Sequence, residues 1–104
     1  QRGDLIWLNF DPRTGHEQSG LSPALALSPE KYNSKTGLLL ACPITSKVKG
    51  YPFEVALQSS KIAGVVLSDQ VRSLDWRICR ARLIEKVPEE TLSAVQEKLL
   101  VLLQ

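Results

Sequence analysis

The stretch that decides the fold is Leu38-Leu39-Leu40-Ala41-Cys42, an unbroken apolar run in the middle of the chain. The run is long enough for a central strand but too short for an independent helix. Pro43 follows it directly, and we expect Pro43 to end the strand because proline cannot donate a hydrogen bond to a strand ladder. The run therefore predicts a buried strand that needs partner strands.

Short strand-like segments flank this run on both sides. Residues 5–10 are rich in apolar and aromatic side chains, and residues 24–27 form a second short apolar segment. Residues 53–57 alternate apolar and polar positions, as expected of a half-buried strand, and residues 65–67 form another strand that ends at Ser68-Asp69-Gln70. Together they predict several short strands.

A further strand is expected over residues 77–84, where arginines alternate with apolar residues. The alternation places Arg80 and Arg82 on the face opposite Cys79 and Leu83. Polar connections rich in Gly, Ser, Asn and Pro separate the strands, and we expect them at residues 11–23, 28–37 and 44–50. The middle connection has room for one helical turn around Lys31 and Tyr32.

The hydrophobic period changes after Pro88, a residue that suits the first position of a helix. Glu89 and Glu90 follow, where the helix dipole favours negative charge. Apolar residues then recur at spacings of three and four, which predicts an amphipathic helix packed on a sheet or on a partner. Its stripe consists of Leu92, Val95, Leu99 and Leu102, widened by Leu100 and Leu103.

Strands followed by one helix, without β-α-β alternation, favour an antiparallel sheet over a parallel one. We expect a single domain over residues 1–104, mainly β with α: an SH3-like small barrel of bent antiparallel strands with a C-terminal helix. The 43% hydrophobic and 23% charged residues are typical of a soluble globular protein.

Several classes of chemistry find no support in the composition. A single histidine, His16, offers no histidine cluster for zinc, and no GKS or GKT phosphate loop or GxSxG elbow occurs. We expect no metal, no cofactor and no membrane span. Cys42 and Cys79 lie in apolar or strand-like runs, which predicts buried free thiols and suits a reducing cytoplasm.

The net charge of +2 permits a nucleic-acid partner without requiring one. Cleavage of RNA needs no metal, because the neighbouring 2′-hydroxyl is a built-in nucleophile that the protein must align while it stabilises charge on phosphorus. Two polar loops, residues 13–22 and 44–50, could supply such groups if they converge.

Five blocks of sequence carry a family resemblance. They are Gly3-Asp4-Leu5-Ile6-Trp7-Leu8-Asn9-Phe10-Asp11-Pro12, Gly15-His16-Glu17-Gln18-Ser19-Gly20 with Pro23-Ala24, Cys42-Pro43-Ile44-Thr45, Lys49-Gly50-Tyr51-Pro52-Phe53-Glu54-Val55, and Asp69-Gln70-Val71-Arg72-Ser73-Leu74-Asp75-Trp76-Arg77. In this order and spacing, covering nearly the whole chain, they resemble the MazF/PemK toxin family. A single block is weak, whereas all of them together are a specific match.

The resemblance implies a compact SH3-like barrel that forms a homodimer. It implies a sequence-specific, metal-independent endoribonuclease toxin that cleaves single-stranded RNA, leaves 2′,3′-cyclic phosphate and 5′-hydroxyl ends, and thereby inhibits translation and growth. The implied partner is a cognate antitoxin whose extended acidic tail occupies the RNA groove. Binding of DNA by the antitoxin complex, a role in stress responses and a cytoplasmic location follow from the same resemblance.

The resemblance also assigns roles to individual residues. Thr45 matches the family's catalytic threonine, expected to hold the scissile phosphate; the alternative is a residue that merely ends a strand. Phe10 could stack on a base or belong to the core. The remaining expected RNA contacts are polar or basic: Arg13, Glu17, Gln18, Ser19, Lys47, Lys49 and Gln70.

Ser22 departs from the family pattern, which carries a catalytic arginine before Pro-Ala. Serine is short and neutral and offers no guanidinium, so we expect this chain to be weakened or inactive. Either Ser22 is a deliberate inactivating substitution, or a natural variant recruits Arg13 or another cation. Other functions stay open: a non-cleaving module that binds RNA or antitoxin, a gyrase poison of the CcdB type, and a plain SH3-like interaction module.

Overall fold

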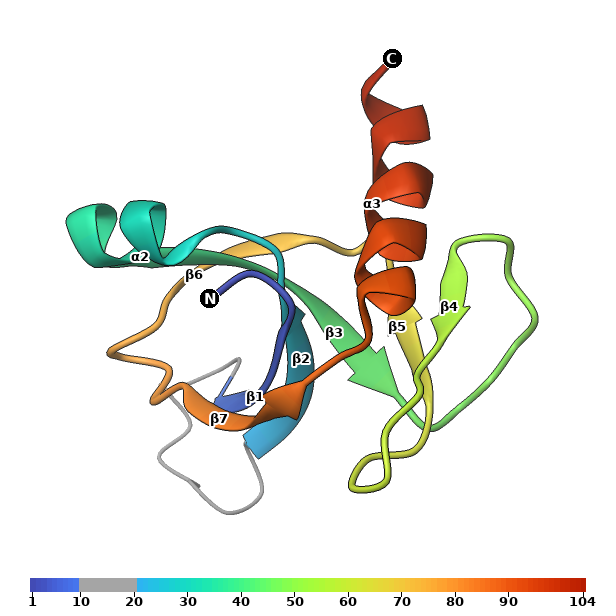
Figure 1. Ribbon diagram of the computed structural model, residues 1–104, viewed down its shortest axis with the longest axis horizontal. Helices are drawn as coiled ribbons and strands as arrows, with labels where there is room; N and C mark the ends of the chain where they lie inside the picture. The colour runs from blue at the N-terminus through green and yellow to red at the C-terminus, as the bar shows by residue number, and fades with distance from the viewer. Residues whose placement is uncertain (10–20) are drawn as a thin grey trace.

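The computed structural model describes residues 1–9 and 21–104 (Figure 1). Its elements in chain order are β1 (Asp4–Asn9), β2 (Leu21–Ala26), α2 (Glu30–Thr36), β3 (Leu38–Thr45), β4 (Glu54–Ala56), β5 (Val65–Leu67), β6 (Arg72–Asp75), β7 (Arg82–Lys86) and α3 (Glu89–Leu103).

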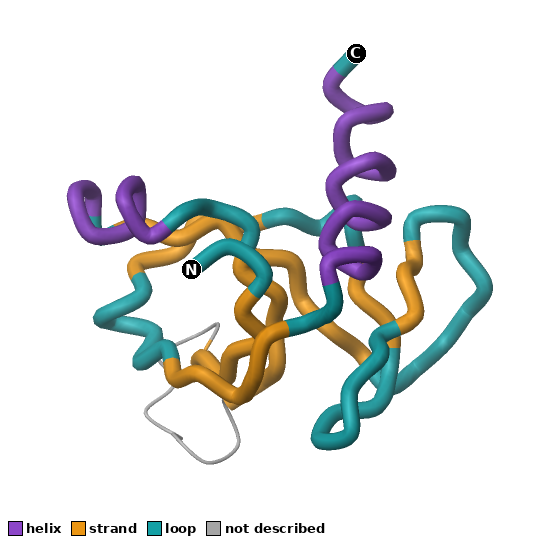
Figure 2. Tube along the Cα trace, viewed as in Figure 1, coloured by secondary structure: helices purple, strands orange, loops and turns teal. Residues whose placement is uncertain are grey.

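The strands of the described residues form one sheet in the order β4-β5-β3-β2-β1-β7, and β6 pairs with β3 beside this path. Every pairing is antiparallel. The sheet bends around β3, whose first half pairs with β6 and whose last residues pair with β5 (Figure 2). The predicted mainly-β antiparallel fold with a C-terminal helix is confirmed, and the apolar run is its central strand.

Two groups of buried side chains lie on the two sides of this bent sheet. One lies between the sheet and α3 and consists of Leu5, Leu25, Leu27, Cys42, Ile44, Val55, Val66, Val87 and Val95. The other is bordered by Trp76 and Ala81 and consists of Ile6, Leu8, Ala24, Ala26, Leu39, Ala41, Leu74 and Cys79. Neighbouring residues of β1 therefore enter opposite cores, as the alternation of side chains along a strand requires. Both cysteines are buried free thiols, as predicted.

The expectation that Pro43 ends the central strand is wrong, because β3 continues through Pro43 to Thr45. Pro43 pairs with Ala24 at the last pair of the β2–β3 ladder. On the opposite edge, the ladder to β6 ends at Ala41 and the ladder to β5 begins at Ile44. The missing N–H thus falls where ladders end, the position in which a sheet tolerates proline. Ile44 and Thr45 consequently belong to a strand rather than to the predicted loop.

The predicted strand over residues 77–84 is also wrong in its first half. Asp75 accepts hydrogen bonds at its side chain from the backbone amides of Arg77 and Ile78, at 3.0 Å each, and forms a turn. Arg80 lies in that turn with φ of +56°, and β7 begins only at Arg82. Cys79 is buried as expected, whereas Leu83 is exposed. The preceding strand β6, Arg72–Asp75, was not predicted, because its sequence RSLD lacks a run of apolar residues.

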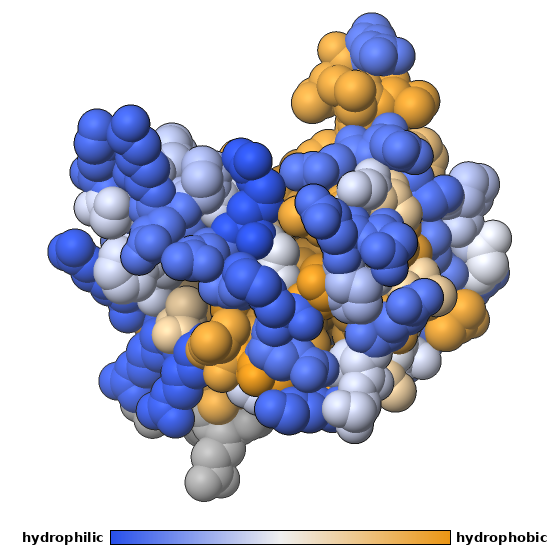
Figure 3. Space-filling model, in the orientation of Figure 1, coloured by the Kyte–Doolittle hydropathy of each residue, from blue (hydrophilic) through white to orange (hydrophobic). Residues whose placement is uncertain are grey.

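Helix α2 is longer than expected, and α3 has the expected extent but not the expected burial along its whole length. The expected single turn near Lys31 is the seven-residue helix α2, which ends at Gly37 in a left-handed conformation with φ of +74°. In α3, Leu92, Val95 and Leu99 pack against the core as predicted, but Leu102 is 48% exposed. Figure 1 shows α3 extending beyond the body of the molecule, and Figure 3 shows an apolar surface at that end. That surface consists of Leu100, Val101, Leu102 and Leu103.

No helix in the described part of the chain is long and apolar enough to cross a membrane.

Candidate functional site

A pocket of about 140 Å³ opens at the C-terminal end of β3. Three segments build it: the end of β3, the β3–β4 loop with the start of β4, and the end of β5 with the turn that follows. Its walls are formed by Thr45, Lys47, Lys49, Tyr51, Glu54, Leu67 and Gln70. We call it the Thr45 pocket. Two lysines, an amide, a hydroxyl and one carboxylate contribute the polar groups of this lining, beside the apolar surfaces of Tyr51 and Leu67. The two lysines and the hydroxyl can bind an anionic group.

Thr45 is half-buried, and its hydroxyl has a defined orientation. Its Oγ1 accepts a hydrogen bond of 3.1 Å from the backbone amide of Lys47. A threonine hydroxyl has one hydrogen to donate and two lone pairs. Because the Lys47 amide uses a lone pair, the hydroxyl hydrogen is left to donate toward a ligand oxygen in the pocket.

The β3–β4 loop brings two lysines to the pocket. Lys47 and Lys49 are exposed, and the Lys49 ammonium lies 5.8 Å from the centroid of the Tyr51 ring. A cation within about 6 Å of an aromatic face is attracted to it. Glu54 contacts the backbone of the same loop and accepts hydrogen bonds from the amides of Lys49 and Gly50 at 3.0 Å each.

Cys42, three residues before Thr45 on β3, carries a chemically inert thiol. Cys42 is fully buried, and its Sγ lies 3.8 Å from the carbonyl oxygen of Ser68. Burial, with a smaller contribution from the charge of Asp69, raises the pKa of the Cys42 thiol to about 12. A thiol that stays protonated is not a nucleophile at neutral pH. The pocket therefore acts by hydrogen bonding and charge rather than through a cysteine.

The predicted site residues fall into three groups. Thr45, Lys47, Lys49 and Gln70 line the same pocket, although they come from separate segments of the chain. Ser22 lies on β2 and pairs with Leu8, two residues beyond the Ala24–Pro43 pair at which the β2–β3 ladder ends; it does not line the Thr45 pocket. The other predicted contacts lie outside the described residues: Phe10, Arg13, Glu17, Gln18 and Ser19.

Three pocket residues were not among the predicted contacts: Tyr51, Glu54 and Leu67. Tyr51 is a 58% exposed aromatic residue between a glycine and a proline, a pattern that could have marked it as a ligand contact. Glu54 offered no such signal, because it occupies a polar position of an alternating strand. Among residues 1–9 and 21–104, no group of three or more His, Cys, Asp or Glu side chains could hold a metal ion.

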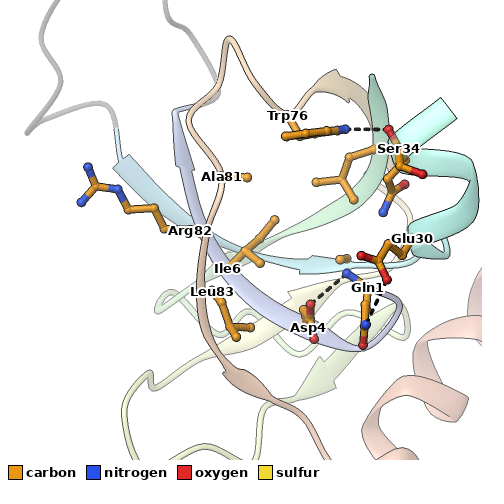
Figure 4. Close-up of a pocket in the computed structure, with 12 residues that line it drawn as sticks. Gln1, Asp4, Ile6, Glu30, Ser34, Trp76, Ala81, Arg82 and Leu83 are labelled. Carbon is orange, nitrogen blue, oxygen red and sulfur yellow. Dashed lines mark hydrogen bonds and ion pairs between the residues drawn. The ribbon is translucent and has the colours of Figure 1, made fainter. Parts of the chain in front are cut away.

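A larger cavity of about 280 Å³ lies at the opposite end of β3, beside α2 (Figure 4). Its floor includes Ile6, Leu39 and Ala81, and the Trp76 indole forms one wall by donating a 2.8 Å hydrogen bond to the carbonyl of Asn33. We call it the Trp76 cavity. Arg82 points away from it (Figure 4). Because it contains none of the expected RNA-contacting residues, the Thr45 pocket is the better candidate site.

Comparison with known proteins gives consistent matches over the whole chain. Residues 1–103 match the model of the family described as PemK-like, MazF-like toxin of type II toxin–antitoxin system. The chain is 48% identical over 101 residues to the endoribonuclease toxin MazF of Escherichia coli strain K12, covering 97% of this chain and 91% of that protein. It is 36% identical over 106 residues to the endoribonuclease toxin ChpB of the same strain, covering 96% of this chain and 88% of that protein.

Solved structures agree with these sequence matches. A crystal structure of MazF from Deinococcus radiodurans is 54% identical, with a TM-score of 0.88 over 99% of this chain and 94% of that one. A MazE–MazF crystal structure from the same organism is 49% identical, with a TM-score of 0.88 over 99% of this chain and 93% of that one. The chain therefore belongs to the PemK-like, MazF-like toxin family of type II toxin–antitoxin systems.

Proposed function

We propose that this chain is a MazF-type endoribonuclease toxin that cleaves single-stranded RNA at specific sequences without a metal ion. The observation that carries the proposal is the Thr45 pocket, in which a donor-competent hydroxyl, two lysines and an amide side chain converge in a chain of this family. The RNA 2′-hydroxyl attacks the adjacent phosphorus, and the 5′-oxygen of the next nucleotide leaves. The products are a 2′,3′-cyclic phosphate and a 5′-hydroxyl.

The pocket residues divide the work of binding and charge stabilisation. The Thr45 hydroxyl donates to a non-bridging phosphate oxygen, where negative charge grows in the transition state. Lys47 and Lys49 attract the phosphate backbone, and Gln70 offers a donor and an acceptor to a base edge. Contacts from Phe10, Arg13, Glu17, Gln18 and Ser19 complete the proposed RNA site.

The same chemistry requires a cation that Ser22 does not supply. Ser22 and Thr45 each lie two residues beyond the Ala24–Pro43 pair that ends the β2–β3 ladder, so the guanidinium of an arginine at position 22 could bind the same phosphate. Loss of one such charge-stabilising donor lowers the rate about 10²–10³-fold. We therefore propose that this chain cleaves RNA weakly or not at all, unless Arg13 or another cation replaces the missing arginine.

The proposed partners are a cognate antitoxin and a second copy of this chain. Relatives of known structure include MazE–MazF complexes, which supports an antitoxin that neutralises the toxin. The exposed apolar end of α3 supports a homodimer, because a contiguous apolar surface favours being covered. The buried free thiols suit a reducing cytoplasm.

The decisive experiment compares the parent protein with Ser22→Arg on a long RNA, with cleavage sites and end groups mapped. Ser22→Arg should raise the cleavage rate about 10²–10³-fold, and EDTA should leave it unchanged. Equal activity in both proteins would remove position 22 from the mechanism. The alternative is a module that binds RNA or antitoxin without cleaving, and the presence of serine at position 22 supports it. Retained RNA binding without cleavage by Ser22→Arg would favour this alternative.

A further inference from the structure

The β3–β4 loop, residues 46–53, carries Lys47, Lys49 and Tyr51 into the Thr45 pocket. None of the described strand pairings includes Lys47, Lys49 or Tyr51, and the backbone hydrogen bond of 3.1 Å from the Ser68 amide to the Phe53 carbonyl holds only the end of the loop. A segment without ladder hydrogen bonds loses conformational entropy when it binds a ligand, unless other contacts already fix it. The contacts that fix this loop therefore control how well its side chains bind RNA.

Glu54 makes the contacts that fix the centre of the loop. One carboxylate oxygen accepts from the Lys49 amide and the other from the Gly50 amide, each at 3.0 Å. The Gly50 N–H is directed at the same carboxylate as that of its neighbour, and the chain then continues through a left-handed conformation at Gly50, with φ of +80°, which glycine adopts readily. The Glu54 amide donates at 3.1 Å to the carbonyl of Tyr51 and closes the turn.

The far side of the loop is held by the C-terminal helix. Lys98 of α3 donates a hydrogen bond from its ammonium to the carbonyl of Pro52. The loop is thus tied to α3 at Pro52, and Glu54 fixes the segment that carries Lys49. Both ties act on backbone atoms, so the side chains of Lys49 and Tyr51 stay available to the pocket.

A carboxylate in a pocket for an anionic ligand weakens binding unless its charge is compensated, because it repels phosphate. Glu54 is compensated, since two backbone N–H groups bind its two oxygens. Both oxygens are thereby directed at the backbone of the loop. Its geometry is that of a brace for the loop rather than that of a general base.

We propose that Glu54 is a positioning residue, which holds the Lys49–Gly50 backbone so that Lys49 and Tyr51 are preorganised for single-stranded RNA. This inference rests on the proposed function of the Thr45 pocket. The direction of the change in RNA affinity distinguishes this role from a purely electrostatic effect of the Glu54 charge. Removal of a negative charge near phosphate should strengthen RNA binding, whereas removal of the brace should weaken it.

The test uses the full chain and Glu54→Gln, which keeps the shape of the side chain but replaces one acceptor oxygen by an NH₂ group. The probe is a 2′-O-methyl RNA that contains the mapped cleavage sequence and lacks the nucleophile. Glu54→Gln should weaken binding about tenfold, since a charged hydrogen bond is lost at the loop. The amides of Lys49 and Gly50 should exchange with solvent about tenfold faster, as measured by NMR. Glu97→Gln, a matched change on α3, is the control and should alter neither quantity.

A double-mutant cycle links Glu54 to Lys49. If Glu54 acts through Lys49, Glu54→Gln combined with Lys49→Ala should bind RNA about as weakly as the weaker single variant. Tighter binding by Glu54→Gln, unchanged amide exchange, or fully additive effects would each overturn the positioning role. A different outcome is that the amides exchange faster in Glu54→Gln but neither Glu54→Gln nor Lys49→Ala alters RNA binding. Glu54 would then hold the loop, but the Thr45 pocket would not be the RNA site. That result would overturn both the proposed function and the role of Glu54 in RNA binding.

Discussion

The two cavities at the ends of β3 differ in size, chemistry and construction. The Trp76 cavity has about twice the volume of the Thr45 pocket, 280 against 140 Å³, and its floor is apolar. Its wall is fixed by buried polar groups, since Asn33 accepts from Trp76 and exchanges hydrogen bonds with Ser28. The Thr45 pocket is smaller and is lined by two lysines, one carboxylate, an amide and a hydroxyl, whereas the lining of the Trp76 cavity includes the two carboxylates of Asp4 and Glu30. The charge of the lining rather than the size of the cavity therefore favours the Thr45 pocket for an anionic ligand.

The largest expected effect is a change in the rate of RNA cleavage that depends on which of the two cavities is altered. In a Ser22→Arg background, Thr45→Val removes the hydroxyl at constant shape and should lower RNA cleavage about 10²-fold, because a donor to the phosphate is lost. Ser34→Ala, at the rim of the Trp76 cavity, is the matched loss of a hydroxyl and should change the rate less than twofold. Single-turnover cleavage of one RNA measures both. A similar loss in both variants would show that the cavities are not functionally distinct.

A change in the Trp76 cavity should appear in stability instead. Trp76→Phe keeps an aromatic wall but loses the hydrogen bond to the Asn33 carbonyl, which should lower the free energy of unfolding by about 1–2 kcal/mol. Urea denaturation monitored by circular dichroism measures this. Affinity for the 2′-O-methyl RNA should stay unchanged. Weaker RNA binding by the folded variant would place the Trp76 cavity in the RNA site.

Cys42, on the strand β3 between the two cavities, makes a pH-dependent contribution to the free energy of unfolding. Its folded-state pKa is raised to about 12, so the folded protein keeps its proton above pH 9 while the unfolded chain loses it. This contribution is fully present below the unfolded pKa and is lost as pH rises toward 12, at about 1.4 kcal/mol per pH unit. When the pH rises from 8 to 10, the free energy of unfolding should fall by about 1.4 kcal/mol less in Cys42→Ala than in the parent protein. Equal losses in urea denaturation would mean that the thiol titrates normally.

The smallest expected effect concerns the two lysines of the Thr45 pocket. Lys47→Ala and Lys49→Ala should each weaken RNA binding several-fold and reduce the slope of log affinity against log salt concentration by about 0.7. Lys31→Ala on α2, an exposed lysine of the same charge, should leave the slope unchanged. Fluorescence anisotropy at several salt concentrations measures this difference. An equal change in all three variants would indicate diffuse attraction by net charge.

Local patterns in the sequence predicted much of this molecule for physical reasons. The run at residues 38–42 had to be buried, and the three-four spacing after Pro88 could only place its apolar side chains on one face of a helix. The resemblance to the MazF/PemK toxins, rather than a local pattern, predicted Thr45 and Gln70 as site residues, and both line one pocket. The periodicity of apolar residues did not predict β6, because the residues of β6 form a strand through their pairing with β3.

The class of fold, the central strand, the C-terminal helix and, through the family motifs, membership of the PemK-like, MazF-like toxins can all be predicted from the amino-acid sequence. Three features became visible only in the folded chain: β3 continues through Pro43, residues 76–80 form a turn, and Glu54 holds the loop of the Thr45 pocket. The physical reason is that periodicity reports which side chains require burial. Ladder ends, turns and backbone hydrogen bonds depend instead on which distant segments meet.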